Sequence, residues 1–214
     1  MNFDRLAIHY SWLEVAFAGD LMQRCRTRFL SHIRQCRHGL LVGEGTGRFL
    51  TQLLQMNPEI QVTCLEQSGG MIRTMQRRLR RAEIDSSRVE FRQVNALDWP
   101  PERGKYDLVA THFFLDCFRK EQLERLVGVL AGSTRPGAFW LVTDFREPEQ
   151  GWRRWRAKAL LTMLYAFFKV TASLAASRLT PPDRYLVGAG FRLRERRLDN
   201  FGFAHSDLWE RTAE

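Results

Sequence analysis

An apolar run that enters three alternating glycines, and then a helical pattern, sets the strongest limit on how this chain folds. The run reads Leu40-Leu41-Val42-Gly43-Glu44-Gly45-Thr46-Gly47-Arg48-Phe49-Leu50. Glycine lets a backbone turn sharply and approach a ligand closely, and the first turn of the next helix offers unpaired N–H groups. The segment therefore predicts a strand, a ligand-binding loop and a helix in direct succession.

Short apolar runs bounded by Gly, Pro, Asn or Asp recur after this point. Their lengths suit strands that are buried on both faces, and the segments between them are long enough for helices. Such alternation predicts βαβ units and a parallel sheet. The expected strands are Gly39–Val42, Gln61–Glu66, Val89–Asn95, Tyr106–His112 and Ala138–Asp144.

The two ends of the chain follow other patterns. Phe3–Arg37 has helical periodicity in two runs separated at Gly19-Asp20, and Gly151–Leu179 is a mostly apolar helix. Phe191–Leu198 alternates apolar and charged residues, and His205–Arg211 is a last possible strand. We expect an α/β, Rossmann-like, doubly wound and mostly parallel sheet of seven strands, with an antiparallel C-terminal hairpin, a helical lead-in and a helical insertion after strand five.

Length and composition agree with one globular domain. The chain has 214 residues, of which 44% are hydrophobic and 27% charged, so a disordered or collagen-like chain is excluded. We expect a single domain over residues 1–214. Its parts are cap helices at 1–37, a cofactor-binding core at 38–145, a helical lid at 146–182 and C-terminal strands at 183–214.

Charge and cysteine usage limit the partners and the compartment. Lys and Arg number 33 against 24 acids, a net charge of +9, which favours contact with polyanions or anionic membranes. The four cysteines form no CxxC and have no histidine at ligand spacing, so we expect no metal and reduced thiols. Neither a targeting segment nor a membrane span is visible. These features predict a cytoplasmic protein, with peripheral membrane contact as an open alternative.

Two common phosphate-binding loops do not fit the glycine run. A dinucleotide loop needs a small third residue in G-x-G-x-x-G/A, where this chain has Arg48, and no G-x-x-x-x-G-K-[ST] is present. The alternate-glycine form resembles motif I of the class I S-adenosylmethionine-dependent methyltransferases.

Further motifs over residues 38–145 resemble the same family in order and spacing. They are Glu66 at 19 residues after Gly47, Ser68-Gly69-Gly70-Met71, Val94-Asn95-Ala96-Leu97-Asp98, Tyr106-Asp107-Leu108-Val109, and Leu130 with Arg135-Pro136-Gly137-Ala138.

The resemblance implies S-adenosylmethionine as cofactor. Glu66 would take both ribose hydroxyls, Met71 would lie against the adenine, and Asn95 would bond its amino group. The family's acidic residue two places before the first glycine is Leu41 here. Glu44 is then the nearest carboxylate for the cofactor's ammonium group, unless it is a solvated loop residue. The implied cofactor-binding residues are Gly43, Glu44, Gly45, Gly47, Glu66, Gln67, Met71, Asn95, Ala96 and His112.

Methyl transfer from a sulfonium needs alignment, a dry cavity and in some cases a base. His112 ends the fourth expected strand, and an unperturbed pKa near 6.5 suits a general base; the alternative is a hydrogen bond to the cofactor or a loop cap. Asp116 is a second catalytic candidate, either orienting His112 or capping the next helix. Phe113 and Phe114 either face the sulfonium or belong to the core.

The segments outside the core are candidates for acceptor selection. Tyr10-Ser11-Trp12 either closes over the cofactor or packs in the core. The insertion contains Trp152, Trp155, Met163, Leu164, Tyr165, Phe167 and Phe168. A helix of this composition suggests a lid over a bulky apolar acceptor, as does a resemblance to ubiquinone- and menaquinone-biosynthesis methyltransferases.

The same insertion has a second interpretation. Residues 151–169 contain five cations and no acid. Basic residues beside tryptophans and an apolar helix are typical of a helix in an anionic lipid interface, here over residues 151–176. A dimer contact, or an ordinary core helix with a solvated basic end, is the alternative.

These observations predict methyl transfer to a small, hydrophobic acceptor at oxygen or carbon. Neither an Asn/Asp-Pro-Pro-Tyr motif nor a Pro-Cys pair follows the fourth strand, so DNA is not the expected substrate. Two alternatives stay open: an RNA or protein methyltransferase that uses the basic surface, and a non-catalytic protein that keeps the cofactor fold. The oligomeric state is not determined by these patterns.

Overall fold

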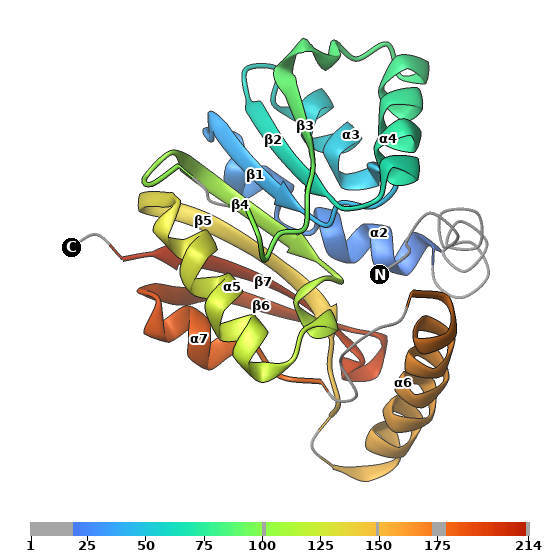
Figure 1. Ribbon diagram of the computed structural model, residues 1–214. Coiled ribbons are helices and arrows are strands. Elements are labelled where there is room, and N and C mark those ends of the chain that lie inside the picture. Colours follow the sequence, from blue (N-terminus) through green and yellow to red (C-terminus); the bar gives the residue numbers. More distant parts are fainter. Residues whose placement is uncertain (1–18, 100–101, 149, 173–178, 213–214) are drawn as a thin grey trace.

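The computed structural model describes residues 19–99, 102–148, 150–172 and 179–212. One sheet runs through these residues in the strand order β3-β2-β1-β4-β5-β7-β6 (Figure 1). The first five strands pair in parallel, and β7 pairs antiparallel with β5 and β6. The predicted seven-stranded, doubly wound sheet with a C-terminal hairpin is confirmed. The strands are β1 (His38–Val42), β2 (Gln61–Glu66), β3 (Val89–Gln93), β4 (Tyr106–His112), β5 (Thr134–Phe145), β6 (Phe191–Asp199) and β7 (Ala204–Arg211).

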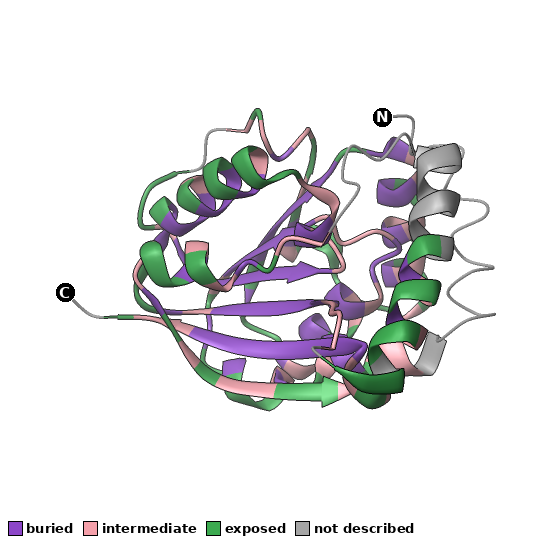
Figure 2. Ribbon diagram, turned by 90° about the horizontal axis from the view of Figure 1, so that it is seen from below, coloured by how far each residue is buried: buried purple, intermediate pink, exposed green. Residues whose placement is uncertain are grey.

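Helices cover both faces of the sheet because neighbouring residues of each buried strand point to opposite sides. On β1, Leu41 packs with α3 and α4, whereas Leu40 and Val42 pack with α5 and α7. Figure 2 shows the buried residues concentrated in the central strands. The helices are α2 (Gly19–Thr27), α3 (Arg48–Met56), α4 (Gly69–Arg81), α5 (Lys120–Gly132), α6 (Gly151–Ala172) and α7 (Asp183–Gly188). Short 3-10 turns are η1 (Leu30–Ile33), η2 (Ser86–Arg88), η3 (Leu115–Cys117) and η4 (Asn200–Gly202).

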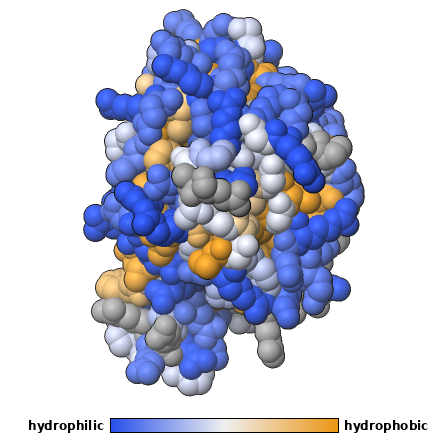
Figure 3. Space-filling view, turned by 90° about the vertical axis from the view of Figure 1, so that its left-hand side faces the viewer, coloured by the Kyte–Doolittle hydropathy of each residue, from blue (hydrophilic) through white to orange (hydrophobic). Residues whose placement is uncertain are grey.

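The insertion after strand five is the helix α6, which stands apart from the two helical layers at the end of the sheet (Figure 1). It has a small core of its own, in which Ala157 and Leu161 pack with Phe203 of the turn before β7. No helix among the described residues is long and apolar enough to cross a membrane. On the face drawn in Figure 3 the surface is mainly hydrophilic, with small apolar areas between.

The largest differences from the expected boundaries are at three elements. The helix that starts near Gly19 ends at Thr27 and is followed by η1, and the first expected helix lies outside the described residues. β5 begins at Thr134 rather than Ala138, because Thr134 pairs with Tyr106 beyond an irregularity in the β4 register. β3 ends at Gln93: the Oδ1 of Asn95 accepts the N–H of Leu97 at 3.2 Å, and such a turn competes with strand pairing.

Candidate functional site

The sheet places the candidate site where the strand order reverses, between β1 and β4. The chain continues from β1 to β2 and β3 on one side and reaches β4 on the other. A crevice outside the carboxyl ends of the strands is expected at such a point. Backbone hydrogen bonds tie the neighbouring loops together there, from Gly43 N to Leu65 O at 2.9 Å and from Val94 N to Glu66 O at 3.2 Å.

The three loop glycines all have positive φ, at +69° for Gly43, +67° for Gly45 and +79° for Gly47. A Cβ at Gly43 would lie 2.2 Å from the ring of Phe114, and one at Gly47 would lie 2.7 Å from Cγ of Met75. A Cβ at Gly45 would meet no atom of the described residues within 4 Å. The outer two glycines therefore make room for the protein's own side chains, whereas the middle one leaves open space beside the loop.

Glu66 stands at the end of β2 and joins two loops of the crevice. Its side chain is buried, with Oε2 accepting the N–H of Gly45 at 3.1 Å and Oε1 accepting the N–H of Ser68 at 2.9 Å. Carboxylate oxygens can each accept more than one hydrogen bond. The structure thus brings the predicted ribose acceptor into direct contact with the open glycine of the loop.

Glu44 makes a contact that sequence reasoning missed. Its Oε1 accepts the N–H groups of Phe49 and Leu50, both at 3.0 Å. These groups belong to the first turn of α3, whose N-cap residue Gly47 has no side chain to cap it. The sequence signal for such a cap is an acidic residue a few positions before a helix whose N-cap residue is glycine. Its role toward an ammonium group stays a prediction.

The remaining predicted cofactor residues lie on the loops after β2 and β3. Ser68 caps α4 by accepting the N–H of Met71 at 3.2 Å, and the Met71 side chain is buried. Gln67 is exposed and Ala96 is buried. Besides its bond from Leu97, Asn95 donates from Nδ2 to Oδ2 of Asp98 at 2.8 Å. The Asn95 amide therefore stabilises its own turn, and its bond to an adenine amino group stays a prediction.

His112 is buried against α3 rather than held in a polar network. Its ring meets the ring of Phe49 edge to face, with centroids 4.5 Å apart, and among the residues that the structure describes neither ring nitrogen has a hydrogen-bond partner. Burial, together with the positive charge of Arg26, lowers the pKa of His112 to about 3. The expectation of a pKa near 6.5 is therefore wrong, because desolvation disfavours the charged ring.

This pKa predicts a pH-dependent stability. The folded-state pKa of about 3 lies below the ordinary value of 6.5, so between these values the unfolded state binds a proton that the folded state excludes. The free energy of unfolding should fall by roughly 1.4 kcal/mol per pH unit from this group as the pH drops below about 6. Urea unfolding of the wild type and His112→Gln at pH 7.5 and 5 measures it. Parallel losses in the two proteins would contradict the assignment.

Asp116 is buried near a second carboxyl group, that of Asp144. It accepts a hydrogen bond from Sγ of Cys117 at 3.5 Å, and burial raises its pKa to about 6. Burial and the nearby Asp116 also raise the pKa of Asp144 on β5, whose Oδ1 accepts the N–H of Phe114 at 3.1 Å. Because α5 begins at Lys120, Asp116 does not cap that helix. Sequence reasoning missed Asp144, which holds the loop after β4.

The structure does not describe every predicted feature, and it describes all four cysteines. Tyr10-Ser11-Trp12 and the side chains of 163–172 lie outside the described residues. The four cysteines are free, and in the part of the chain that is described no three His, Cys, Asp or Glu side chains are arranged to hold a metal ion.

Comparison with known proteins finds a family match over the segment that carries this candidate site. Residues 40–137 match the family model of the methyltransferase domain, so the match begins on β1 and ends within β5. No curated protein matches the chain significantly in sequence.

Solved structures share the fold at low sequence identity. An O-methyltransferase family protein from Burkholderia thailandensis is 19% identical, with a TM-score of 0.67 over 99% of this chain and 63% of that one. The mitomycin 7-O-methyltransferase MmcR is 15% identical, with a TM-score of 0.72 over 99% of this chain and 61% of that one. The 1,6-didemethyltoxoflavin-N1-methyltransferase of Burkholderia thailandensis is 13% identical, with a TM-score of 0.70 over 99% of this chain and 86% of that one. The chain thus spans less than two thirds of the first two structures.

Proposed function

We propose that this chain, whose residues 40–137 match the family model of the methyltransferase domain, transfers a methyl group from S-adenosylmethionine to a small, hydrophobic acceptor at oxygen or carbon. One observation carries the proposal. The only loop glycine with open space at its Cβ position, Gly45, donates its N–H to the buried carboxylate of Glu66. An open backbone beside a buried acceptor is what a nucleoside with an amino-acid tail requires.

The residues present fit that cofactor. Glu66 would accept from a ribose, Gly45 leaves room for close approach, and Met71 and Ala96 add buried apolar surface on the neighbouring loops. Among solved structures with this fold, the toxoflavin enzyme is described with bound S-adenosylhomocysteine. When bound, the cofactor supplies a methyl group on a sulfonium, which is already activated for displacement.

The chain's own residues then have to orient and desolvate the reacting groups. Phe114 closes the β4 side of the glycine loop by packing on Gly43. Its neighbour Phe113 packs instead on Phe145, with ring centroids 4.8 Å apart, and the Arg26 guanidinium lies over its ring. His112 is neutral at pH 7 because its pKa is lowered to about 3. Buried polar atoms in proteins are nearly always hydrogen-bonded, so we favour a hydrogen bond from this ring to a bound ligand over a base role.

The solved structures with this fold and the composition of α6 support a small, hydrophobic acceptor. The structures with this fold include enzymes named for mitomycin and for 1,6-didemethyltoxoflavin, and the latter is described with that small molecule bound. The insertion α6 starts with two tryptophans, and its later sequence is rich in aromatic residues and methionine. Apolar side chains of this kind line sites for small molecules.

Calorimetric titration tests the cofactor part of the proposal. We expect the protein to bind S-adenosylmethionine and S-adenosylhomocysteine at a single site. A protein that binds neither would be a non-catalytic relative of the fold, which would refute the proposal.

Labelled cofactor then tests the acceptor. Mass spectrometry of lipid and polar extracts, incubated with the protein and methyl-labelled S-adenosylmethionine, should show label in an apolar small molecule. Label in RNA or protein, with turnover that falls steeply as salt rises, would instead favour the alternative that uses the basic surface.

A further inference from the structure

Three large aromatic side chains near the start of α6 are exposed to solvent. Trp152 is 60% exposed, Trp155 is 75% exposed and Phe201 of η4 is 58% exposed. The Trp152 and Phe201 rings contact each other, with centroids 5.5 Å apart, so residues 49 positions apart in the chain form one surface. We call Trp152, Trp155 and Phe201 the aromatic patch.

Packing within the described chain does not explain this patch. The buried side of α6 is formed by Ala157 and Leu161. A helix advances about 100° per residue, which places Trp152 and Trp155 on the opposite side, facing away from that small core. Large exposed apolar groups that lie together mark a surface that binds a partner.

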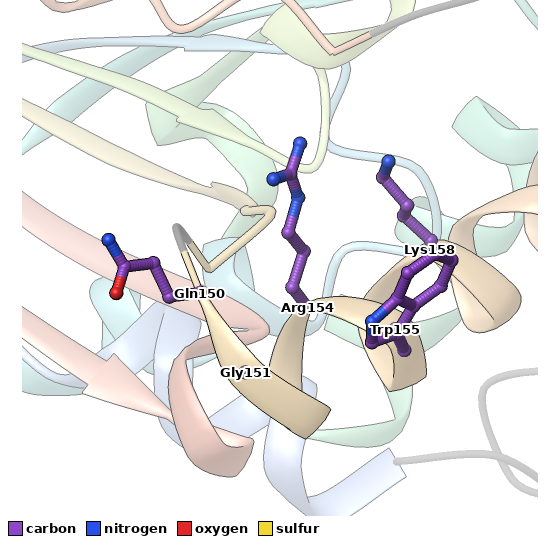
Figure 4. Close-up of a pocket in the computed structure, with 5 residues that line it drawn as sticks. All are labelled: Gln150, Gly151, Arg154, Trp155 and Lys158. Carbon is purple, nitrogen blue, oxygen red and sulfur yellow. The ribbon is translucent and has the colours of Figure 1, made fainter.

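Cations surround the rings. Nζ of Lys158 lies 5.7 Å from the Trp155 ring, and the Arg156 guanidinium lies 5.5 Å from the Phe201 ring. Arg154 and Lys158 extend in the same direction from α6 with Trp155 beside them (Figure 4), and they line a hollow of about 370 Å³ with Gln150 and Gly151.

The cations outnumber the acids that accompany them. Oε1 of Glu147 lies 2.8 Å from Arg154 Nε and 3.7 Å from Lys158 Nζ. One carboxylate thus serves two cations, and residues 151–169 add no acid of their own. The surface around the rings is therefore positively charged.

We propose that the aromatic patch and its flanking cations dock this protein onto an anionic lipid surface. Tryptophan prefers the boundary between headgroups and acyl chains, where its ring is buried and its N–H stays hydrated. Lys and Arg beside it attract anionic lipids and extend their charged ends toward the headgroups. Resting on the proposed function, this contact brings the enzyme to the place where a hydrophobic acceptor collects.

Vesicle sedimentation tests the inference. Wild-type protein should bind vesicles of phosphatidylcholine that contain about 30% phosphatidylglycerol. It should bind vesicles of pure phosphatidylcholine at least about tenfold more weakly. The double variant Trp152→Ala/Trp155→Ala should lose about tenfold or more in binding to the anionic vesicles. Trp152→Phe/Trp155→Phe should retain most of it, and raising the salt concentration should weaken wild-type binding.

Val187→Ala is the control, because Val187 is a 61% exposed apolar residue on α7, outside the patch; it should bind like the wild type. Equal binding to both vesicle types, or unchanged binding by the double alanine variant, would overturn the inference. So would self-association of the wild type that the same variant abolishes, since a second copy would then be the occupant. Calorimetry with S-adenosylmethionine on these variants tests the proposed function separately and verifies folding.

Discussion

Replacing Glu66 with alanine should weaken the binding of S-adenosylmethionine by about 100-fold or more. The change removes a charged acceptor from the position assigned to the ribose, and hydrogen bonds to charged groups contribute about 1.5–3 kcal/mol each. It also releases the N–H groups of Gly45 and Ser68, which the two carboxylate oxygens now hold at 3.1 and 2.9 Å. The loops on both sides of the crevice would then lose their shared anchor.

Calorimetry measures this loss, and two further variants separate its causes. Glu66→Gln keeps an oxygen acceptor and the side-chain volume but lacks the charge, so its affinity should fall between those of the wild type and the alanine variant. Glu59→Gln alters an exposed carboxylate that pairs with Arg37 and should bind normally. Unchanged affinity in Glu66→Ala, with an unaltered thermal melt, would mean that the cofactor site lies elsewhere.

Gly43→Ala should lower the free energy of unfolding by about 2–5 kcal/mol. A residue with a Cβ costs about 1–2 kcal/mol in the left-handed region, which Gly43 occupies at φ +69°. The new methyl group would also lie 2.2 Å from the Phe114 ring, and overpacking of this kind costs typically about 1–3 kcal/mol. Denaturation in urea measures the difference.

Gly45→Ala is the matched control, since its φ of +67° is nearly the same but its Cβ would meet nothing within 4 Å. It should lose only the backbone cost, about 1–2 kcal/mol, while impairing cofactor binding. Phe114→Ala should cost less free energy of unfolding in the Gly43→Ala variant than in the wild type, because there it also removes the clash with the new methyl group. Equal losses at Gly43 and Gly45 would show that the ring does not pack on the loop.

Local patterns were enough to predict the sheet and its loops. The limits of β2 (Gln61–Glu66) and β4 (Tyr106–His112) agree with those expected, because strands buried on both faces appear in sequence as apolar runs that end at turn residues. The positive φ of all three loop glycines likewise follows from their spacing in a strand–loop–helix unit. Glu66 could be predicted to lie beside the glycine loop because a strand end and its distance from the glycines are both visible in sequence, and the structure places it there.

Contacts between distant residues decided the rest. The low pKa of His112 comes from burial against α3 and from Arg26, and desolvation depends on every element packed around a group. Asp116 lies close enough to Asp144 to raise its pKa only because β4 and β5 are neighbours in the sheet. The outward direction of Trp152 and Trp155 depends on which side of α6 is buried, and a helix with apolar residues all round does not reveal that side until it packs.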